Sequence, residues 1–417
     1  MHIVVMGAGV VGITTAWFLQ QQGHQVTVVD RQAQAGLETS YANGGQISVC
    51  HAEPWANPSA PLKILKWLFQ PEAPLLYRPR LDRYQWRWAL SFLTQCTSAR
   101  AAHNIRQMVN LGTYSRSQLQ ALRKELDLDY DHLEKGILHF YTSQQEFDAA
   151  MEPARIMREL GCDRQVIDAD RAVELEPALK DVRQRIAGAT YTADDESGDA
   201  RKFTQALARR CAEAGVEFRY GTEVLGFDKA GDRILGVQTL TEGRHQVLRA
   251  DSYVLCLGSF SAVLARRLGL FLNIYPAKGY SITVPLKNPD VAFQVSLTDD
   301  EYKLVYSRLG DRIRVAGTAE LNGYTRNLDF IRCRAIVRRA AGILPEAGHW
   351  DQAEYWTGLR PTTPSNVPYI GKSHFSNLYL NTGHGTLGWT HSCGSAAALA
   401  DIVAGRTPEV DFTFTGL

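Results

Sequence analysis

The stretch MHIVVMGAGVVGITTAWFLQQQGHQVTVVD, residues Met1–Asp30, decides the fold class of this chain. Its pattern predicts a buried strand, a glycine turn from Gly7 to Gly12, a helix and a second strand that ends before Asp30. This order of elements is typical of a unit that binds an adenine dinucleotide. We therefore expect an α/β protein built outward from a Rossmann-like unit.

Each glycine of the turn has its own role in such a unit. Gly7 permits the tight turn, Gly9 lets a pyrophosphate approach the backbone, and Gly12 lets the helix pack closely against the strand. The helix that follows the turn offers unpaired N–H groups and the positive end of its dipole to the phosphates. The stretch thus predicts a phosphate cradle made mostly of backbone.

Asp30 closes the unit roughly twenty residues after the glycine turn, where an acidic side chain binds the ribose hydroxyl pair. A carboxylate at this position argues against a 2′-phosphate and hence against NADP. The unit by itself leaves FAD and NAD open as the dinucleotide.

The composition is that of an ordinary globular protein. The 417 residues suffice for two domains, and 45% of them are hydrophobic and 21% charged. A net charge of +1 without a long basic run gives no reason to expect nucleic acid as a partner. The seven cysteines form no C-x-x-C pair, which favours a reducing compartment and argues against a disulfide framework or a metal site.

The chain shows no signal for membrane insertion or export. No apolar run reaches the ~18 residues of a membrane span, and the first apolar segment is the nucleotide-binding strand instead of a signal peptide. We therefore expect a cytoplasmic protein.

The segment Leu62–Phe69 (LKILKWLF) qualifies that expectation. It predicts a short, basic, amphipathic helix with Trp67 at its rim, which is typical of an element that rests on a membrane surface or gives access to a quinone. The alternative, which we favour slightly, is a helix packed on the core with its lysine side chains reaching solvent. Peripheral contact with the inner face of the cell membrane stays open.

The segment Glu38–Ile47 (ETSYANGGQI) is rich in glycine and small polar residues. Its backbone groups and hydroxyls could meet a flat heteroaromatic ring, and a plain surface loop explains the composition equally well.

Strand and helix patterns return well after the first unit, with Asp199 at the start of a helix and a buried strand at 252–257. The dinucleotide-binding domain is therefore expected to be discontinuous. Between Tyr275 and Glu320 the pattern changes to period-2 alternation, which predicts a mixed or antiparallel sheet in a second domain.

Two further features could carry chemistry. The run Gly383–Gly388 (GHGTLG) precedes a long helix whose N-terminus would stabilise the negative charge of a reduced flavin, although a tightly packed strand–turn–helix is the alternative. Arg360 in Gly-Leu-Arg-Pro could hold a substrate carboxylate, although a surface role is the default for any single arginine. No acid–base team is indicated, so a cofactor is expected to carry the reaction.

The chain resembles the FAD-dependent D-amino acid dehydrogenases (small subunit), of the D-amino-acid-oxidase/glycine-oxidase group of flavoproteins. The similarity runs nearly end to end. The motifs that carry it are GAGVVGITTAW at Gly7–Trp17, ETSYANGGQIS at Glu38–Ser48, YPAKGYS at Tyr275–Ser281, RIRVAGTAE at Arg312–Glu320, WTGLRP at Trp356–Pro361 and NTGHGTLGWT at Asn381–Thr390.

The resemblance implies FAD as cofactor and hydride transfer from the Cα of a D-amino acid to the flavin. The imino acid would hydrolyse to a 2-oxo acid and ammonia, and the electrons would pass to a quinone or other acceptor. Arg360 becomes the expected carboxylate anchor, and Tyr280 and Tyr302 are further candidates for substrate contacts. The helix that begins near Trp389 is expected to stabilise the reduced flavin.

The residues expected to contact FAD are Gly7, Gly9, Val10, Val11, Gly12, Asp30, Arg31, Thr39, Ser40, Asn43, Gly44, Gly45, Gln46, Ile47, Val224, Gly258, Gly383, His384, Gly385, Thr386, Leu387 and Gly388. The expected architecture is a Rossmann-like FAD-binding domain with an inserted substrate domain. The FAD-binding domain would comprise residues 1–130, 195–272 and 350–417, and the substrate-binding domain residues 131–194 and 273–349.

Two rival functions stay open. An amine or amino-acid oxidase of the glycine/sarcosine oxidase type would pass its electrons to O₂. A flavin subunit without turnover of its own would serve an electron-transfer complex.

Overall fold

The first thirty residues form the centre of a six-stranded sheet in the structure, a computed structural model that describes residues 1–67, 70 and 72–416. β1 (His2–Met6) and β2 (Gln25–Val29) flank α1 (Val10–Gln21) and pair in parallel, as the sequence predicts. The order is β19-β20-β13-β1-β2-β9, and each neighbouring pair is parallel except β19 with β20. The other strands are β9 (Glu217–Arg219), β13 (Ser252–Leu255), β19 (Tyr369–Lys372) and β20 (Leu378–Thr382).

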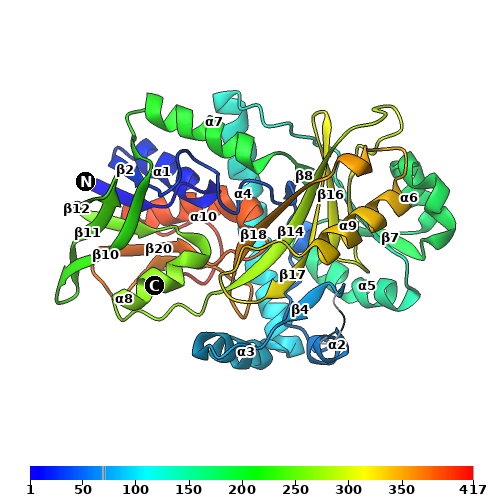
Figure 1. Cartoon of the computed structure of the whole chain (residues 1–417), viewed down its shortest axis with the longest axis horizontal. Helices are drawn as coiled ribbons and strands as arrows, with labels where there is room; N and C mark the ends of the chain where they lie inside the picture. Colours follow the sequence, from blue (N-terminus) through cyan, green and yellow to red (C-terminus); the bar gives the residue numbers. More distant parts are fainter. Residues whose placement is uncertain (68–69, 71, 417) are drawn as a thin grey trace.

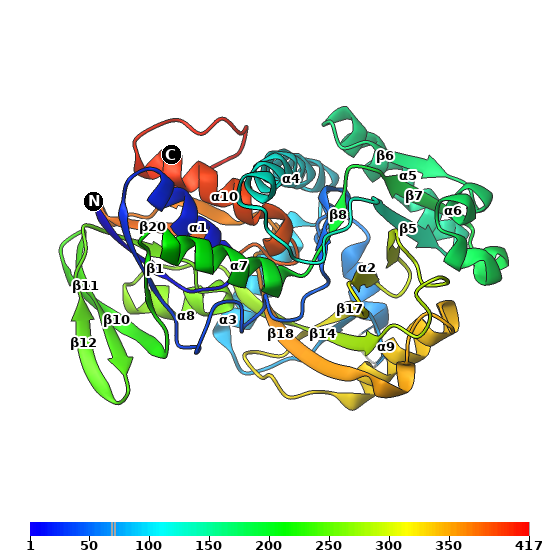
Figure 2. The same ribbon diagram turned by 90° about the horizontal axis from the view of Figure 1, so that it is seen from above.

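Both faces of this sheet are covered, because successive residues of a strand face opposite sides. Ile3 and Val5 pack with α1, α7 (Ala200–Glu213) and α10 (Gly388–Val403). Val4 and Met6 face α8 and a three-stranded ribbon. These elements are α8 (Ser261–Arg267), β10 (Thr222–Ala230), β11 (Arg233–Thr241) and β12 (Arg244–Leu248). Figures 1 and 2 show the layers at the end of the molecule that holds the N-terminus.

A nine-stranded sheet forms the other half of the molecule, in the order β18-β14-β17-β16-β15-β5-β7-β6 with β4 paired to β17. Its pairs are antiparallel except β15 with β5 and β17 with β4. α9 (Phe330–Ile343) and α6 (Ala169–Leu175) pack on it in one apolar core. The strands are β4 (Leu75–Tyr77), β5 (Ile137–Tyr141), β6 (Arg164–Ile167), β7 (Gly188–Thr192), β14 (Tyr275–Pro285), β15 (Ser296–Asp299), β16 (Leu304–Leu309), β17 (Arg312–Leu321) and β18 (Glu354–Thr362).

The α/β class with a second, mixed sheet is thereby confirmed, and two strands differ from the expected division of the chain. β18 pairs along its length with β14, so it belongs to the nine-stranded sheet although residues 350–417 were expected in the other domain. β4, expected within residues 1–130, pairs with β17. Strand pairing depends on a partner that is distant in sequence, and neither segment carries a local signal for that partner.

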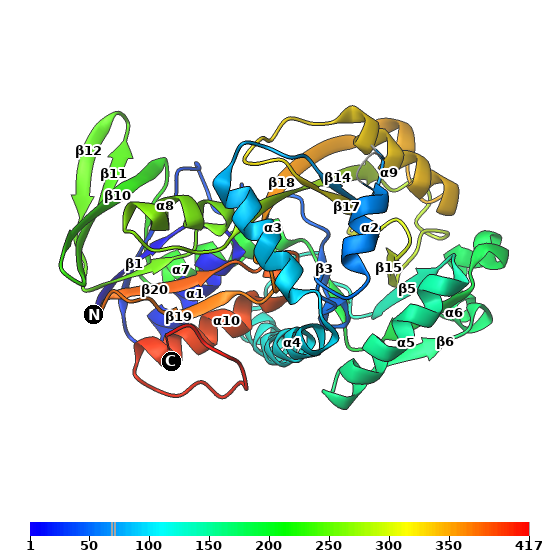
Figure 3. The same cartoon turned by 90° about the horizontal axis from the view of Figure 1, so that it is seen from below.

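The remaining helices surround the region between the two sheets. α2 and α3 lie side by side on the lower edge of the view in Figure 1 and face the viewer in Figure 3, whereas α4 packs against α10. The helices are α2 (Ala60–Trp67), α3 (Arg83–Gln95), α4 (Ser98–Leu126) and α5 (Gln144–Glu159), and the single-turn or irregular 3₁₀ segments are η1 (Val49–His51), η2 (Pro177–Arg185), η3 (Gly258–Phe260) and η4 (Trp350–Gln352).

The expected helix at Leu62–Phe69 is only partly described. Residues 62–67 lie in α2, and Leu68 and Phe69 fall outside the described residues. In the described part of the chain, no helix is both long enough and apolar enough to cross a membrane.

Candidate active site and cofactor cradle

A cavity of about 940 Å³ is lined by residues of both large sheets. It gathers most of the residues that the sequence singled out, from segments hundreds of residues apart. The predicted residues that line it are Gly7, Gly9, Val10, Val11, Asp30, Arg31, Thr39, Ser40, Asn43, Gly44, Gly45, Gln46, Val224, Gly258, Tyr280, Arg360, Gly383, His384, Gly385, Thr386, Leu387 and Gly388. Gly12, Ile47 and Tyr302 do not line it.

The glycine turn of the first unit has three different steric environments. Gly7 has a φ of +111°, and a Cβ there would lie 2.5 Å from the carbonyl oxygen of Cys256. A Cβ at Gly12 would lie 1.9 Å from the carbonyl oxygen of Gly7. At Gly9 the nearest protein atom to such a Cβ is Ser40 Oγ, at 3.6 Å. Protein packing therefore requires Gly7 and Gly12, whereas Gly9 leaves room that suits a ligand such as a pyrophosphate.

Polar groups around the start of α1 complete this cradle. The Val10 N–H donates to Ser40 Oγ at 3.0 Å. Asp30 accepts hydrogen bonds from the backbone N–H groups of Ala8 (2.7 Å) and Gln32 (2.8 Å). Burial raises the pKa of Asp30 from its ordinary value, and the bonds from Ala8 and Gln32 oppose the rise. An ionised carboxylate accepts about four hydrogen bonds, so Asp30 keeps acceptor capacity for a ribose hydroxyl.

The glycine-rich loop that follows is held by the nine-stranded sheet. Arg314 Nη1 donates to the carbonyl oxygen of Asn43 at 3.2 Å, and Ser307 Oγ donates to that of Gly44 at 2.7 Å. A Cβ at Gly44 would lie 2.5 Å from Val305 Cγ2. The loop ends in β3 (Gln46–Ile47), which pairs with β8 (Glu196–Ser197). The loop is therefore a fixed wall of the cavity and not the plain surface loop that the sequence left open.

A second glycine turn, before α10, approaches the cavity from the other side. Gly383 and Gly385 have φ values of +84° and +55°, which glycine adopts without strain. His384 is buried, and burial followed by the nearby His391 lowers its pKa to about 3. Within the part of the chain that the structure describes, His384 Nε2 and Trp389 Nε1 are buried without a hydrogen-bond partner.

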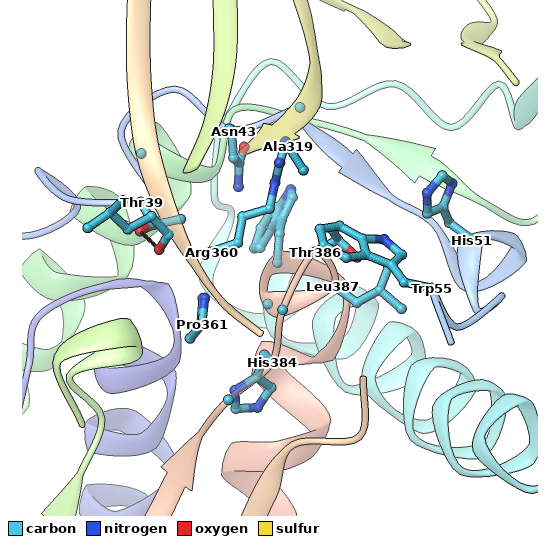
Figure 4. Close-up of a pocket in the computed structure, with 18 of the residues that line it drawn as sticks. Thr39, Asn43, His51, Trp55, Ala319, Arg360, Pro361, His384, Thr386 and Leu387 are labelled. Atoms are coloured by element: carbon cyan, nitrogen blue, oxygen red, sulfur yellow. Dashed lines mark hydrogen bonds between the residues drawn. The ribbon is translucent and has the colours of Figure 1, made fainter. Parts of the chain in front are cut away.

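Arg360 reaches into the cavity from β18 (Figure 4). Its Nη1 donates to the carbonyl oxygen of Thr318 at 2.7 Å, and among the described residues no carboxylate forms an ion pair with it. Burial and the nearby Arg332 lower the pKa of Arg360 to about 10. A Cβ at Gly279 would lie 2.4 Å from the guanidinium carbon, so Gly279 provides the space for this side chain. A partly desolvated cation without a described carboxylate beside it is costly, which suits a group that binds an anionic ligand.

The two tyrosine candidates have different environments. Tyr280 lines the cavity, but its hydroxyl donates to Glu320 at 2.6 Å. Burial opposes the ionisation of Glu320, yet Tyr280 and Lys278 outweigh it and lower the pKa of this carboxyl to about 2. Tyr302 is 44% exposed and lies under the guanidinium of Arg339, 4.0 Å from its ring centre. It follows the turn after β15, which directs its side chain to the surface, so the structure does not bring Tyr302 to the site.

Sequence reasoning missed the short segment Val49–His51, which follows the glycine-rich loop directly. Asp195 accepts from the N–H groups of Val49 and Cys50, both at 3.0 Å, and Arg164 donates to the Cys50 carbonyl oxygen at 3.1 Å. The segment thus presents His51 at the cavity wall, where Figure 4 labels it beside Trp55. Burial, followed by His139, lowers the pKa of His51 to about 4.

Behind this segment lies a buried chain of polar groups. Cys50 Sγ lies 3.1 Å from His139 Nε2, and His139 Nδ1 lies 2.7 Å from Asp300. Asp300 also pairs with Lys303 at 2.8 Å. Burial disfavours the ionised form of Asp300, but Lys303 and His139 outweigh it and hold its pKa well below the usual range. These residues come from η1, β5 and the turn that follows β15, and no local spacing in the sequence could have joined them.

The residues present fit a bound flavin dinucleotide. Gly9 offers bare backbone at the start of α1, and Asp30 closes the same end. At the other end, the buried and unpartnered Trp389 Nε1 and His384 Nε2 are the kind of polar groups that a ligand satisfies. The fold and the cavity therefore define the class of dinucleotide-dependent oxidoreductases, and Arg360 lines the same cavity as the glycine turns.

Comparisons with known proteins specify the family. A family model described as FAD dependent oxidoreductase matches residues 2–402. A D-amino acid dehydrogenase of Dechloromonas aromatica is 55% identical over 415 residues, 99% of either chain. One of Paramagnetospirillum magneticum is 50% identical over 418 residues, 100% of this chain and 98% of the relative.

Solved structures agree on the fold. An L-proline dehydrogenase from P. horikoshii has a TM-score of 0.77 at 17% identity, and 98% of this chain and 95% of that chain are covered. A glycine oxidase from Geobacillus kaustophilus has a TM-score of 0.76 at 23% identity, with 100% and 98% covered.

The chain belongs to the FAD-dependent oxidoreductase family, and its cofactor is FAD. The resemblance to D-amino acid dehydrogenases that the six motifs indicate is confirmed over the full length.

Proposed function

We propose that this protein oxidises D-amino acids such as D-alanine to 2-oxo acids and ammonia, and passes the electrons to a quinone-type acceptor. The relatives at 55% and 50% identity are D-amino acid dehydrogenases, and the identity extends over the whole chain. FAD, when bound, supplies the acceptor for the hydride that leaves the substrate Cα. A dehydrogenase passes its electrons to an acceptor other than O₂, and we infer a quinone-type acceptor from the similarity to dehydrogenases.

The observation that carries the substrate class is the guanidinium of Arg360, which has no ion-pair partner among the described residues. An arginine fork binds a carboxylate with two parallel hydrogen bonds, and such charge-assisted bonds are stronger in a buried site. Arg360 Nη1 already donates to the Thr318 carbonyl oxygen, which fixes the orientation of the fork. In our proposal Arg360 holds the substrate carboxylate and thereby orients Cα, so proximity supplies much of the rate enhancement.

The cavity walls support the rest of the reaction. α10 begins at Gly388, which lines the cavity. The positive end of the helix dipole therefore lies at the cavity wall, where it favours negative charge. His384 stays neutral because burial and His391 lower its pKa to about 3. At neutral pH it therefore carries no positive charge that would compete with the guanidinium of Arg360. The FAD contacts in this proposal are the predicted residues that line the cavity, with Gly12 and Ile47 supporting them from behind.

The expected division into domains becomes a proposal with two changes. We propose that the six-stranded sheet and its helices hold the adenine end of FAD, and that the nine-stranded sheet, including β18 and β4, forms the substrate side.

Anaerobic titration tests the proposed function directly. D-Alanine should bleach the absorbance of the bound flavin, and L-alanine should not. In air, turnover with an artificial quinone should exceed peroxide formation. Peroxide formed in proportion to substrate would show an oxidase, and a flavin that no D-amino acid bleaches would show a subunit without turnover of its own.

We also propose that α2 contacts a membrane surface. Ile64 and Trp67 line the cavity from one side of this helix, while Leu62 and Leu65 are largely exposed on the other. A lipid-soluble acceptor could therefore reach the cavity next to α2. Vesicle sedimentation should weaken in Leu62→Ser/Leu65→Ser and stay unchanged in Leu235→Ser, a control on the exposed part of β11. Equal sedimentation of all three proteins would exclude the contact.

A further inference from the structure

A second, smaller cleft lies beside α3, outside the cavity described above. Its volume is about 340 Å³, and it lies where α3 meets the segment that follows α8. Its lining residues are Arg83, Tyr84, Arg87, Arg266, Gly269, Leu270 and Phe271. The cleft thus joins three guanidinium groups and two aromatic rings, and the proposed oxidation of an amino acid uses none of them.

The three arginines of this cleft are stacked on the two rings. The guanidinium carbon of Arg266 lies 3.4 Å from the ring centre of Tyr84, and that of Arg87 lies 3.6 Å from the ring centre of Phe271. Arg83 lies 4.8 Å from the Tyr84 ring and donates to its hydroxyl at 2.7 Å. Stacking on a ring face leaves the N–H edges of a guanidinium free to bind an anion.

No carboxylate neutralises this cluster among the residues that the structure describes, since Arg83, Arg87 and Arg266 form no ion pair there. The adjacent Asp82 accepts instead from the Tyr84 N–H at 2.9 Å and from the Tyr275 hydroxyl at 3.1 Å. Three like charges around one small cleft repel each other, and a bound anion relieves that repulsion. A phosphate group has enough oxygen acceptors to meet more than one of the forked donors at once.

The exposed surface of α3 identifies the source of the phosphate. Residues of a helix are separated by about 100°, which places Trp86, Leu90 and Leu93 in one stripe next to the row formed by Arg83 and Arg87. All three apolar side chains of this stripe are about half exposed or more, at 48%, 64% and 51%. The opposite face of the helix is buried. An apolar stripe on the outer face of a helix, beside arginines, is typical of contact with lipid.

The neighbouring helix extends the same surface. Leu62 and Leu65 of α2 are exposed, and α2 and α3 lie side by side on the face that Figure 3 presents. Leu81, directly before α3, is fully exposed as well. A soluble phosphate ligand would explain the arginines but not the exposed leucines next to them.

We propose that the arginine cleft (Arg83, Arg87 and Arg266) binds the phosphate of an anionic phospholipid, and that it thereby docks the α2–α3 face on a membrane. This inference rests on the proposed membrane contact of α2 and adds a head-group site to it. The apolar side chains enter the lipid, and the cleft gives the contact its preference for negative charge.

Vesicle sedimentation of the FAD-loaded protein tests the head-group site. Vesicles of phosphatidylcholine alone are compared with vesicles that also contain phosphatidylglycerol. The wild type should partition more strongly onto the anionic vesicles. Arg83→Gln/Arg87→Gln/Arg266→Gln should lose about fivefold in partition coefficient for each arginine, because a basic residue near an anionic surface contributes ~1 kcal/mol. Flavin bleaching by D-alanine in the absence of vesicles should be unchanged.

The matched control is Arg233→Gln/Arg244→Gln/Arg249→Gln, which removes the same charge from exposed positions of the ribbon and its edge. Equal losses in the two triple variants would overturn the site, because only net charge would matter. Equal binding of the wild type to both kinds of vesicle would overturn it as well, while leaving the α2 contact intact. If inorganic phosphate raises the melting temperature of the wild type but not of the cleft variant, and vesicles do not bind, a free phosphate is the occupant and the lipid is excluded.

Discussion

At the scale of single residues, two arginines, Arg164 and Arg360, have opposite surroundings. Arg164 is 1% exposed and donates to Glu53 at 2.6 Å and to the Tyr141 hydroxyl at 2.8 Å. Arg360 lines the cavity and has one backbone carbonyl as its hydrogen-bond partner. The first side chain is part of the framework, and the second is available to a ligand.

This contrast gives a prediction for Arg360→Ala. Losing the anchor should raise KM for D-alanine and lower kcat/KM about a hundredfold or more, because a buried charge pair with the substrate carboxylate is lost. FAD should stay bound. The free energy of unfolding should change by only about 1 kcal/mol, since one hydrogen bond is removed.

Arg164→Ala is the comparison for stability. It should cost about 3 kcal/mol in urea unfolding, because it removes a buried side chain and leaves the buried Tyr141 hydroxyl and Cys50 carbonyl oxygen without its hydrogen bonds. Unchanged kinetics in Arg360→Ala would exclude the anchor role, and a stability loss as large as that of Arg164→Ala would make Arg360 a structural residue.

Gly279 offers an indirect test of the same guanidinium. A Cβ there would lie 2.4 Å from the guanidinium carbon of Arg360, which is the end of a flexible side chain and can move aside. Gly279→Ala should therefore raise KM about tenfold or more with little change in stability. In the Arg360→Ala background the same substitution should have no further effect on KM. A full additional effect in that background would mean that Gly279 acts independently of Arg360.

At the scale of elements, the contact between α4 and α10 depends on one glycine. The Gly394 N–H donates to Ser115 Oγ at 2.9 Å, and a Cβ at Gly394 would lie 2.7 Å from the Cα of Ser115. Backbone cannot move aside as a side-chain end can, so Gly394→Ala should lower the free energy of unfolding by about 1–3 kcal/mol.

Gly342 in α9 is the matched control, because among the described residues a Cβ there would meet nothing within 4 Å beyond its chain neighbours and its own helix backbone. Gly342→Ala should raise stability by about 0.5–1 kcal/mol through helix propensity. Both variants are compared with the wild type in urea unfolding. A stabilising Gly394→Ala would show that α4 and α10 are not in close contact at this point.

His391 makes the same helix pair sensitive to acid. Burial lowers its pKa to about 4, although a hydrogen bond to the Met108 carbonyl oxygen opposes the shift. Between pH 6.5 and pH 4 the unfolded chain therefore binds a proton at this position that the folded chain refuses. Because the unfolded state binds more protons, stability should fall as the pH drops through this window.

The variant His391→Gln removes the titrating group and keeps an N–H donor for Met108. Wild type and variant should differ in their stability change between pH 7 and pH 5 by about 2 kcal/mol, with the wild type losing more. His245→Gln on the exposed ribbon controls for the introduction of glutamine. Parallel pH profiles for wild type and His391→Gln would show that His391 does not resist protonation in the folded state.

The sequence predicted correctly those elements whose interactions are local along the chain, and it did not predict those whose partners are distant in sequence. The glycine turn and α1 depend on neighbours in the chain, so the pattern of Met1–Asp30 was sufficient for them. β18 pairs with β14 and β4 pairs with β17. Since both partners are distant in sequence, the local pattern could not show to which sheet β18 and β4 belong. The series of polar contacts from Cys50 through His139 to Asp300 joins residues that are far apart in the sequence, so no local spacing predicts it. Arg360 could be proposed because the motif that surrounds it resembles one of a known family, whereas its lack of an ion pair among the described residues is not visible in the sequence.

At the scale of the whole molecule, the cavity is lined by two bodies that each have an apolar core of their own. The six-stranded sheet supplies Gly7, Gly9 and Asp30, and the nine-stranded sheet supplies Arg360 and the support of the glycine-rich loop. FAD therefore contacts both bodies in our proposal, and it should stabilise them together in proportion to its affinity, because a ligand that binds only the folded state shifts unfolding by mass action.

Gly9→Val separates this contribution of the cofactor from the stability of the chain. The nearest described atom to a Cβ at Gly9 is Ser40 Oγ, at 3.6 Å, so the apoprotein should unfold close to the wild-type temperature. The valine side chain should block the approach of the pyrophosphate, and the rise in melting temperature that FAD produces in the wild type should disappear. Gly12→Ala is the contrasting variant, since its Cβ would lie 1.9 Å from the Gly7 carbonyl oxygen and should destabilise the apoprotein itself. If Gly9→Val and the wild type gain equal stability from FAD, the pyrophosphate does not lie against Gly9, and the adenine end of the cofactor must be held elsewhere in the cavity.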